Sequence, residues 1–186
     1  MTSEVFTPAN LLTISRMVLV PVFALCMFYG HPGWALATFI VAGLTDLLDG
    51  LIARWTRQQT TLGAWLDPTA DKLLLVTAFL ILTLPSFGLT HRLPVWLTVL
   101  VISRDVGIVV TVAIINLAVA PRTFKPSPLG KVATATFLAT AFLTLYANYG
   151  TVPQGVLDGL VYASLVMTLL SAGDYVRRLL GPAVAS

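Results

Sequence analysis

Apolar residues occur in six long runs along the chain, and polar or turn-forming residues separate these runs. A helix that crosses a membrane needs about 20 mostly apolar residues, and most of the runs approach or reach that length. The runs cover, approximately, residues 11–29, 34–52, 69–84, 94–119, 129–149 and 156–180. Glycine and proline mark most of the breaks, as expected for turns. The pattern predicts an all-α integral membrane protein with six transmembrane helices, which form a single domain over residues 1–186.

Composition and charge favour a membrane over nucleic acid as the environment of this chain. It is 57% hydrophobic and only 10% charged, and its formal net charge is +3. Soluble domains carry roughly 25% charged residues, so a chain with so few charges cannot easily cover itself in water. Most of the basic residues stand at or near the ends of the apolar runs, where anionic lipid or phosphate is a better partner than nucleic acid.

The basic residues also predict an orientation in the membrane. With six spans, both termini and the loops after the second and fourth runs lie on one side, and the opposite loops contain only Arg92. The basic residues on the first side are Arg54, Arg57, Arg122, Lys125, Lys131, Arg177 and Arg178. By the positive-inside rule, that side faces the cytoplasm of a bacterial-type inner membrane, or the matrix at a mitochondrial inner membrane.

Four of the eight acidic residues fall within or beside apolar runs, between positions 46 and 71. Ionisable residues are costly inside a bilayer and usually face a polar cavity or a functional site. Asp46 and Asp49 are three residues apart, and Asp67 and Asp71 are four apart, so each pair shares one face of a helix. The polar stretch 55–62 between the pairs predicts a turn that joins two antiparallel helices. The two acidic faces are therefore expected to meet.

Four carboxylates at one point favour a divalent cation, because a cation relieves their mutual repulsion. Oxygen donors without His or Cys suit Mg²⁺, Mn²⁺ or Ca²⁺ better than zinc. Mg²⁺ commonly binds substrate phosphates as well, and Arg54 lies on the face of Asp46 and Asp49, where it suits a phosphate oxygen. Gly50 and Ala53 on that face leave room for a flat ligand. Interhelical salt bridges and helix caps are the structural alternative, which explains one or two acids better than four.

The stretch from Asp46 to Asp71 resembles the signature of the CDP-alcohol phosphatidyltransferases, D-x2-D-G-x2-A-R-x8-G-x3-D-x3-D, with every fixed position present. The resemblance implies six helices around a polar cavity that faces the cytoplasm, and a homodimer. It implies Mg²⁺ or Mn²⁺ as the cofactor, as two ions on the four aspartates, with Asp71 also the general base. The CDP-binding residues would be Asp46, Gly50, Ala53, Arg54, Gly63 and Asp67.

Segments outside the signature resemble family members with glycerol-type acceptors. Residues 42–50 and 102–106 are similar to eukaryotic-type cardiolipin synthases, which join CDP-diacylglycerol to phosphatidylglycerol. Phosphatidylglycerophosphate synthases, whose acceptor is glycerol 3-phosphate, usually have Arg-Glu where this chain has Arg104-Asp105, and a further Arg near Val112. The resemblance therefore favours cardiolipin synthase. The expected acceptor-binding residues are Arg104, Arg122, Lys125 and Lys131, the last in a segment similar to both groups.

Several alternatives stay open on sequence alone. Arg104 and Asp105 are either an internal ion pair or a substrate contact, and contact is favoured for Arg104. Arg122 and Lys125 also fit ordinary positive-inside anchoring. As whole-protein functions, the alternatives are phosphatidylglycerophosphate synthase, a small ion transporter and a non-catalytic membrane scaffold. The intact acidic set, with Arg54 beside it, argues against the last two.

Overall fold

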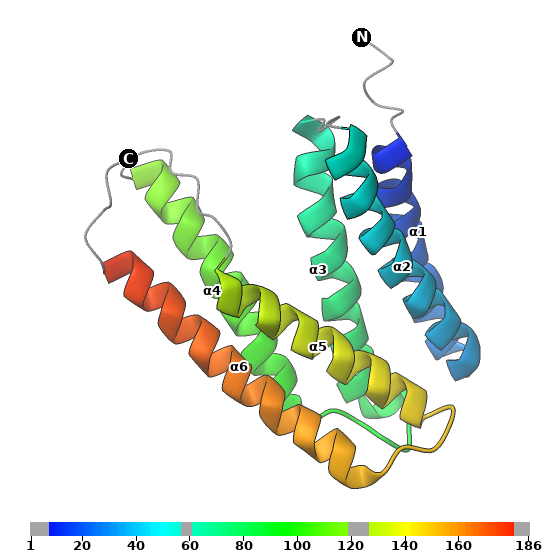
Figure 1. Ribbon diagram of the computed structural model, residues 1–186. Helices are drawn as coiled ribbons and strands as arrows, with labels where there is room; N and C mark the ends of the chain where they lie inside the picture. The colour runs from blue at the N-terminus through cyan, green and yellow to red at the C-terminus, as the bar shows by residue number, and fades with distance from the viewer. Residues whose placement is uncertain (1–7, 57–60, 119–126, 181–186) are drawn as a thin grey trace. The chain divides into compact units, whose positions relative to one another are not determined.

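A computed structural model describes residues 8–56, 61–118 and 127–180, and for some helical segments, including 49–56 and 61–71, it describes the backbone only. All regular structure in these ranges is helical (Figure 1). The elements are α1 (Pro8–Phe28), α2 (Pro32–Thr56), α3 (Thr61–Thr83), the short 3-10 helix η1 (Pro85–Phe87), α4 (Val95–Ala118), α5 (Pro128–Ala147) and α6 (Gln154–Leu180). The six helices predicted from the apolar runs are confirmed.

The helix boundaries follow local chemistry more closely than hydrophobicity does. Pro8, Pro32 and Pro128 each stand at the first position of a helix, where a missing N–H breaks no helical hydrogen bond. The third helix begins at Thr61, eight residues before its predicted start, and α2 continues to Thr56. The predicted turn at 55–62 was therefore too long. Adding residues to an existing helix is favourable even where they are polar, so the helices extend beyond their apolar portions.

The chain divides into two compact units. Unit 1 contains residues 1–92 with 144–151, and in it α1 packs against both α2 and α3 (Figure 1). Its core includes Phe23 of α1 and Phe39 of α2, whose ring centroids lie 6.0 Å apart. Aromatic burial of this kind is a large part of what holds such helices together.

Unit 2 contains residues 93–143 with 152–186, and in it α4 packs against α6. Hydroxyl groups add polar links between its helices. The Thr140 hydroxyl of α5 lies 2.8 Å from the Ser164 hydroxyl of α6, and both residues are fully buried. Small hydroxyl side chains that bond across an interface are typical of helix packing in membranes.

Two of the helices in the described ranges are long and apolar enough to cross a membrane by length and composition. They cover Pro128–Ala147 and Gln154–Arg177, and shorter apolar helices cover Ile14–Phe28 and Lys72–Thr83. Large apolar side chains such as Phe28 and Trp34 are more than two-thirds exposed. An apolar surface of this kind suits contact with lipid better than contact with water.

Candidate active site

The four signature aspartates lie at matching depths in the pair of helices α2 and α3. Asp46 comes ten residues before the end of α2, and Asp71 comes ten residues after the start of α3. At a rise of 1.5 Å per residue, each lies about 15 Å from its end of the helix. Asp49 and Asp67 lie about 10 Å from the same ends. Each aspartate of one helix therefore has a counterpart at a similar distance from the connection between α2 and α3.

Among the four signature aspartates, the structure describes the side chain of Asp46. The carboxylate of Asp46 forms an ion pair with Arg16 of α1. Arg16 Nη1 lies 2.9 Å from Asp46 Oδ1. The Arg16 side chain is fully buried, whereas that of Asp46 is 42% exposed. A buried charge needs a close partner, because removing that partner leaves the charge poorly compensated. Arg16 thus fixes one oxygen of a carboxylate that stays accessible.

Arg16 was not among the site residues predicted from the sequence. A signal was nevertheless available, because Arg16 interrupts the apolar run at 11–29. An ionisable residue in such a run usually faces a polar partner inside the helix bundle, and its partner here is thirty residues away on the next helix.

The donor set on α2 and α3 fits a hard divalent cation. It consists of carboxylates, the ligands that Mg²⁺ and Mn²⁺ prefer. Asp46 offers an exposed carboxylate that is already held in place from one side. The side chains of Asp49, Asp67 and Asp71 lie outside the described residues, as do those of Ala53 and Arg54 and the surroundings of Gly50 and Gly63.

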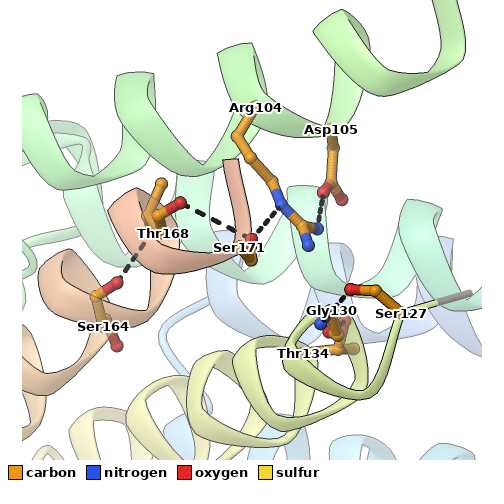
Figure 2. A network of polar contacts seen from close by, with 8 residues as sticks. All are labelled: Arg104, Asp105, Ser127, Gly130, Thr134, Ser164, Thr168 and Ser171. Atoms are coloured by element: carbon orange, nitrogen blue, oxygen red, sulfur yellow. Dashed lines mark hydrogen bonds and ion pairs between the residues drawn. The ribbon is translucent and has the colours of Figure 1, made fainter. Parts of the chain in front are cut away.

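A second charged cluster lies in unit 2, around Arg104 of α4 (Figure 2). Arg104 Nη1 donates to Asp105 Oδ1 at 2.6 Å, and Nε donates to Ser171 Oγ of α6 at 2.9 Å. The side chains of Arg104 and Asp105 are only 10% and 13% exposed. The internal ion pair considered from sequence is therefore present. Contact between Arg104 and the acceptor stays a prediction.

The start of α5 approaches the same arginine. Ser127 precedes α5, and its hydroxyl accepts the Gly130 N–H at 2.9 Å, which caps the helix. A Cβ atom on Gly130 would stand 3.3 Å from Arg104 Nη2 and 3.2 Å from Ser127 Oγ. Glycine therefore permits the close approach drawn in Figure 2. The next residue, Lys131, is exposed, whereas Arg122 and Lys125 lie outside the described residues.

Comparison with known proteins agrees with the signature. A family model described as CDP-alcohol phosphatidyltransferase matches residues 6–170. The chain is 36% identical over 182 residues to a probable phosphatidylglycerophosphate synthase of Mycobacterium tuberculosis, with 92% of this chain and 81% of that protein covered. It is 36% identical over 193 residues to a probable cardiolipin synthase (CMP-forming) of Drosophila melanogaster, with 93% and 58% covered.

A third relative, the cardiolipin synthase (CMP-forming) of Rattus norvegicus, is 40% identical over 117 residues, which is 62% of this chain and 37% of that protein. The names of these relatives divide between two kinds of phospholipid synthase. The family match runs through both compact units and includes the whole signature. This chain therefore belongs to the CDP-alcohol phosphatidyltransferase family, the transferases of phospholipid biosynthesis.

Proposed function

We propose that this protein transfers the phosphatidyl group of CDP-diacylglycerol to a hydroxyl of phosphatidylglycerol, which forms cardiolipin and releases CMP. The observation that carries this proposal is the complete signature from Asp46 to Asp71 on two consecutive helices, with Asp46 held by a buried arginine. A phosphoanhydride bond of the donor breaks, a phosphodiester bond to the acceptor oxygen forms, and the acceptor proton leaves.

Asp71 is the proposed general base that takes this proton. A positioned base of this kind makes the alcohol a better nucleophile. Arg54 contacts the diphosphate, and the cytidine lies against Gly50, Ala53 and Gly63. Asp46 and Asp67 contribute to CDP binding as well. All four aspartates are the proposed ligands of two Mg²⁺ or Mn²⁺ ions, which when bound would neutralise charge on the diphosphate.

The setting proposed for this chemistry is a membrane, with all six helices crossing it as one domain over residues 1–186. Support comes from the membrane-associated family, from the two long apolar helices and from the charge asymmetry of the loops. The termini and the active site would face the cytoplasm or the mitochondrial matrix. A homodimer is proposed on family resemblance alone.

Phosphatidylglycerol is the proposed acceptor because of the charges around Arg104. Asp105 lies 2.6 Å from Arg104 and offsets much of its charge. The neighbourhood therefore suits the monoanionic diester of phosphatidylglycerol better than the dianion of glycerol 3-phosphate. Val112 adds no further cation in α4. Phosphatidylglycerophosphate synthase is the second candidate. It is supported by a relative of that name, and the match to this chain covers 81% of that relative's length.

A product assay tests this proposal. Purified protein in detergent receives CDP-diacylglycerol and Mg²⁺, with phosphatidylglycerol or glycerol 3-phosphate offered separately, and mass spectrometry identifies the lipid product. Cardiolipin from phosphatidylglycerol is expected. Product from glycerol 3-phosphate alone would overturn the proposed acceptor, and no CMP release with either acceptor would overturn the proposed transfer reaction.

A further inference from the structure

The guanidinium group of Arg104 is held on two of its three nitrogens. Nη1 bonds to Asp105 on the same helix, and Nε bonds to Ser171 on α6 (Figure 2). Nη2 faces the start of α5, 3.3 Å from where a Cβ of Gly130 would stand. Within the ranges that the structure describes, Nη2 has no hydrogen-bond partner. Because guanidinium is planar, two anchors fix the direction of the third nitrogen.

Ser171 is buried, and its hydroxyl has a second, longer contact within α6. It is 2% exposed, and its hydroxyl lies 3.5 Å from the backbone oxygen of Thr168, to which it donates. A hydroxyl has one donor and two acceptor lone pairs. With the proton directed at Thr168, the lone pairs are free to accept from Arg104 Nε. Rotation of the Ser171 side chain would break the 2.9 Å hydrogen bond to Arg104 Nε.

Ser164, two turns earlier on α6, shows what a purely structural serine does in this helix. It is also fully buried, and its hydroxyl pairs with the neutral hydroxyl of Thr140. Ser171 instead bonds to a cation on α4. Hydrogen bonds to charged groups are stronger than neutral ones and define geometry more sharply. The two serines are thus both buried and have different partners.

We infer that Ser171 is a positioning residue for Arg104, and that it directs Nη2 at the phosphodiester monoanion of a lipid acceptor. This inference rests on the proposed function, because it assumes that Arg104 contacts the acceptor. Asp105 reduces the charge of Arg104 and Ser171 sets its direction, so the arginine offers one donor edge to one phosphate oxygen. Gly130 keeps the approach to that edge free of a methyl group.

The test compares Ser171→Ala with the matched control Ser164→Ala in the full-length protein. Initial rates are measured against phosphatidylglycerol and, separately, against CDP-diacylglycerol. Ser171→Ala is expected to raise the KM for phosphatidylglycerol by about tenfold, the size of one lost charged hydrogen bond. The KM for CDP-diacylglycerol should not change. Ser164→Ala should leave both KM values unchanged, although it too removes a buried hydroxyl.

A double-mutant cycle with Arg104→Lys separates positioning from general loosening of the helices. Lysine has no Nε–H for Ser171 to accept, so Ser171→Ala should add little to the acceptor KM in that background. Equal effects of Ser171→Ala in both backgrounds would overturn the inference. Gly130→Ala approaches the same guanidinium from α5, and it should raise the acceptor KM even if Ser171→Ala cannot be purified.

The failure of this inference differs from the failure of the proposed function. A wild-type protein that forms cardiolipin while Ser171→Ala behaves like Ser164→Ala overturns the inference alone. A rise in the KM of both substrates in Ser171→Ala also overturns it, because that result indicates a structural role. A wild-type protein that uses only glycerol 3-phosphate overturns the proposed acceptor and the phosphodiester assignment together.

Discussion

The two compact units each contain an arginine–aspartate pair, and the pairs are built in opposite ways. In unit 1 the arginine is hidden and the aspartate is 42% exposed, and the two residues come from different helices. In unit 2 the residues are neighbours on α4, and the arginine is aimed by Asp105 and Ser171. The first pair presents an anion, which suits a cation ligand. The second pair is buried on both sides, and among the described residues it leaves Arg104 Nη2 without a hydrogen-bond partner, which suits an anionic ligand.

This difference separates the expected effects of mutation. Changes near Asp46 should weaken a step that every acceptor shares, because the acids of unit 1 belong to the proposed metal and CDP site. Changes near Arg104 should depend on which acceptor is offered.

Asp71→Asn should have the largest effect, because it removes the proposed base. CMP release is expected to fall by about 10³-fold, within the range of general base catalysis. The loss should be equal with phosphatidylglycerol and with glycerol 3-phosphate. Size-exclusion chromatography in detergent checks that the variant is folded. Full activity in a folded variant would show that Asp71 is not the base.

Arg16→Met should come next, because methionine fills similar space without holding Asp46. The Mg²⁺ concentration for half-maximal rate is expected to rise by about tenfold, as for loss of other groups that orient a metal ligand. Without substrate, Mg²⁺ should raise the thermal midpoint of the variant less than that of the wild type. A lower Mg²⁺ requirement would mean that Arg16 competes with the cation for Asp46.

Arg104→Lys should affect the acceptor alone. Lysine keeps the charge and loses the planar donor edge, so the KM for phosphatidylglycerol is expected to rise by about tenfold. The KM for CDP-diacylglycerol serves as the internal control. If both values rise together, the cluster around Arg104 supports the fold and has no special relation to the acceptor.

Asp105→Asn should have the smallest effect, and on specificity more than on rate. Asparagine can still accept from Arg104 Nη1, while the net positive charge of the cluster increases. The ratio of kcat/KM for glycerol 3-phosphate to that for phosphatidylglycerol is expected to rise by about fivefold, the effect of one modest charge interaction. An unchanged ratio would show that the charge around Arg104 does not determine which acceptor the enzyme uses.

The sequence predicts the six helices well, because each contains a long apolar run, and the signature predicts the family. The sequence does not predict side-chain contacts in which the two residues lie on different helices. Spacing places Asp46 and Asp49 on one face, but nothing in the spacing connects Asp46 to Arg16, thirty residues away. Ser171 and Ser164 look alike within the same apolar helix, and only the packing of α4 against α6 gives Ser171 a charged partner.

The early start of α3 was missed for a related reason. Hydrophobicity marks the apolar portion of a helix, and residues 61–68 include polar and turn-forming types. The order of residues does not reveal that the helix continues through them. Gly63 and Asp67 lie in this portion, so the part of α3 that the hydrophobic pattern missed carries two of the proposed CDP-binding residues.

The buried arginine in α1 has a consequence for how the nascent chain enters a bilayer. A charged side chain at the centre of a lone membrane helix costs about 2.5–3.5 kcal/mol during insertion by the translocon. Arg16 reaches Asp46 only when α2 has been synthesised. In the six-span arrangement proposed above, insertion of α1 into lipid is therefore expected to be unfavourable until α2 arrives, and the two helices are expected to leave the translocon as a pair.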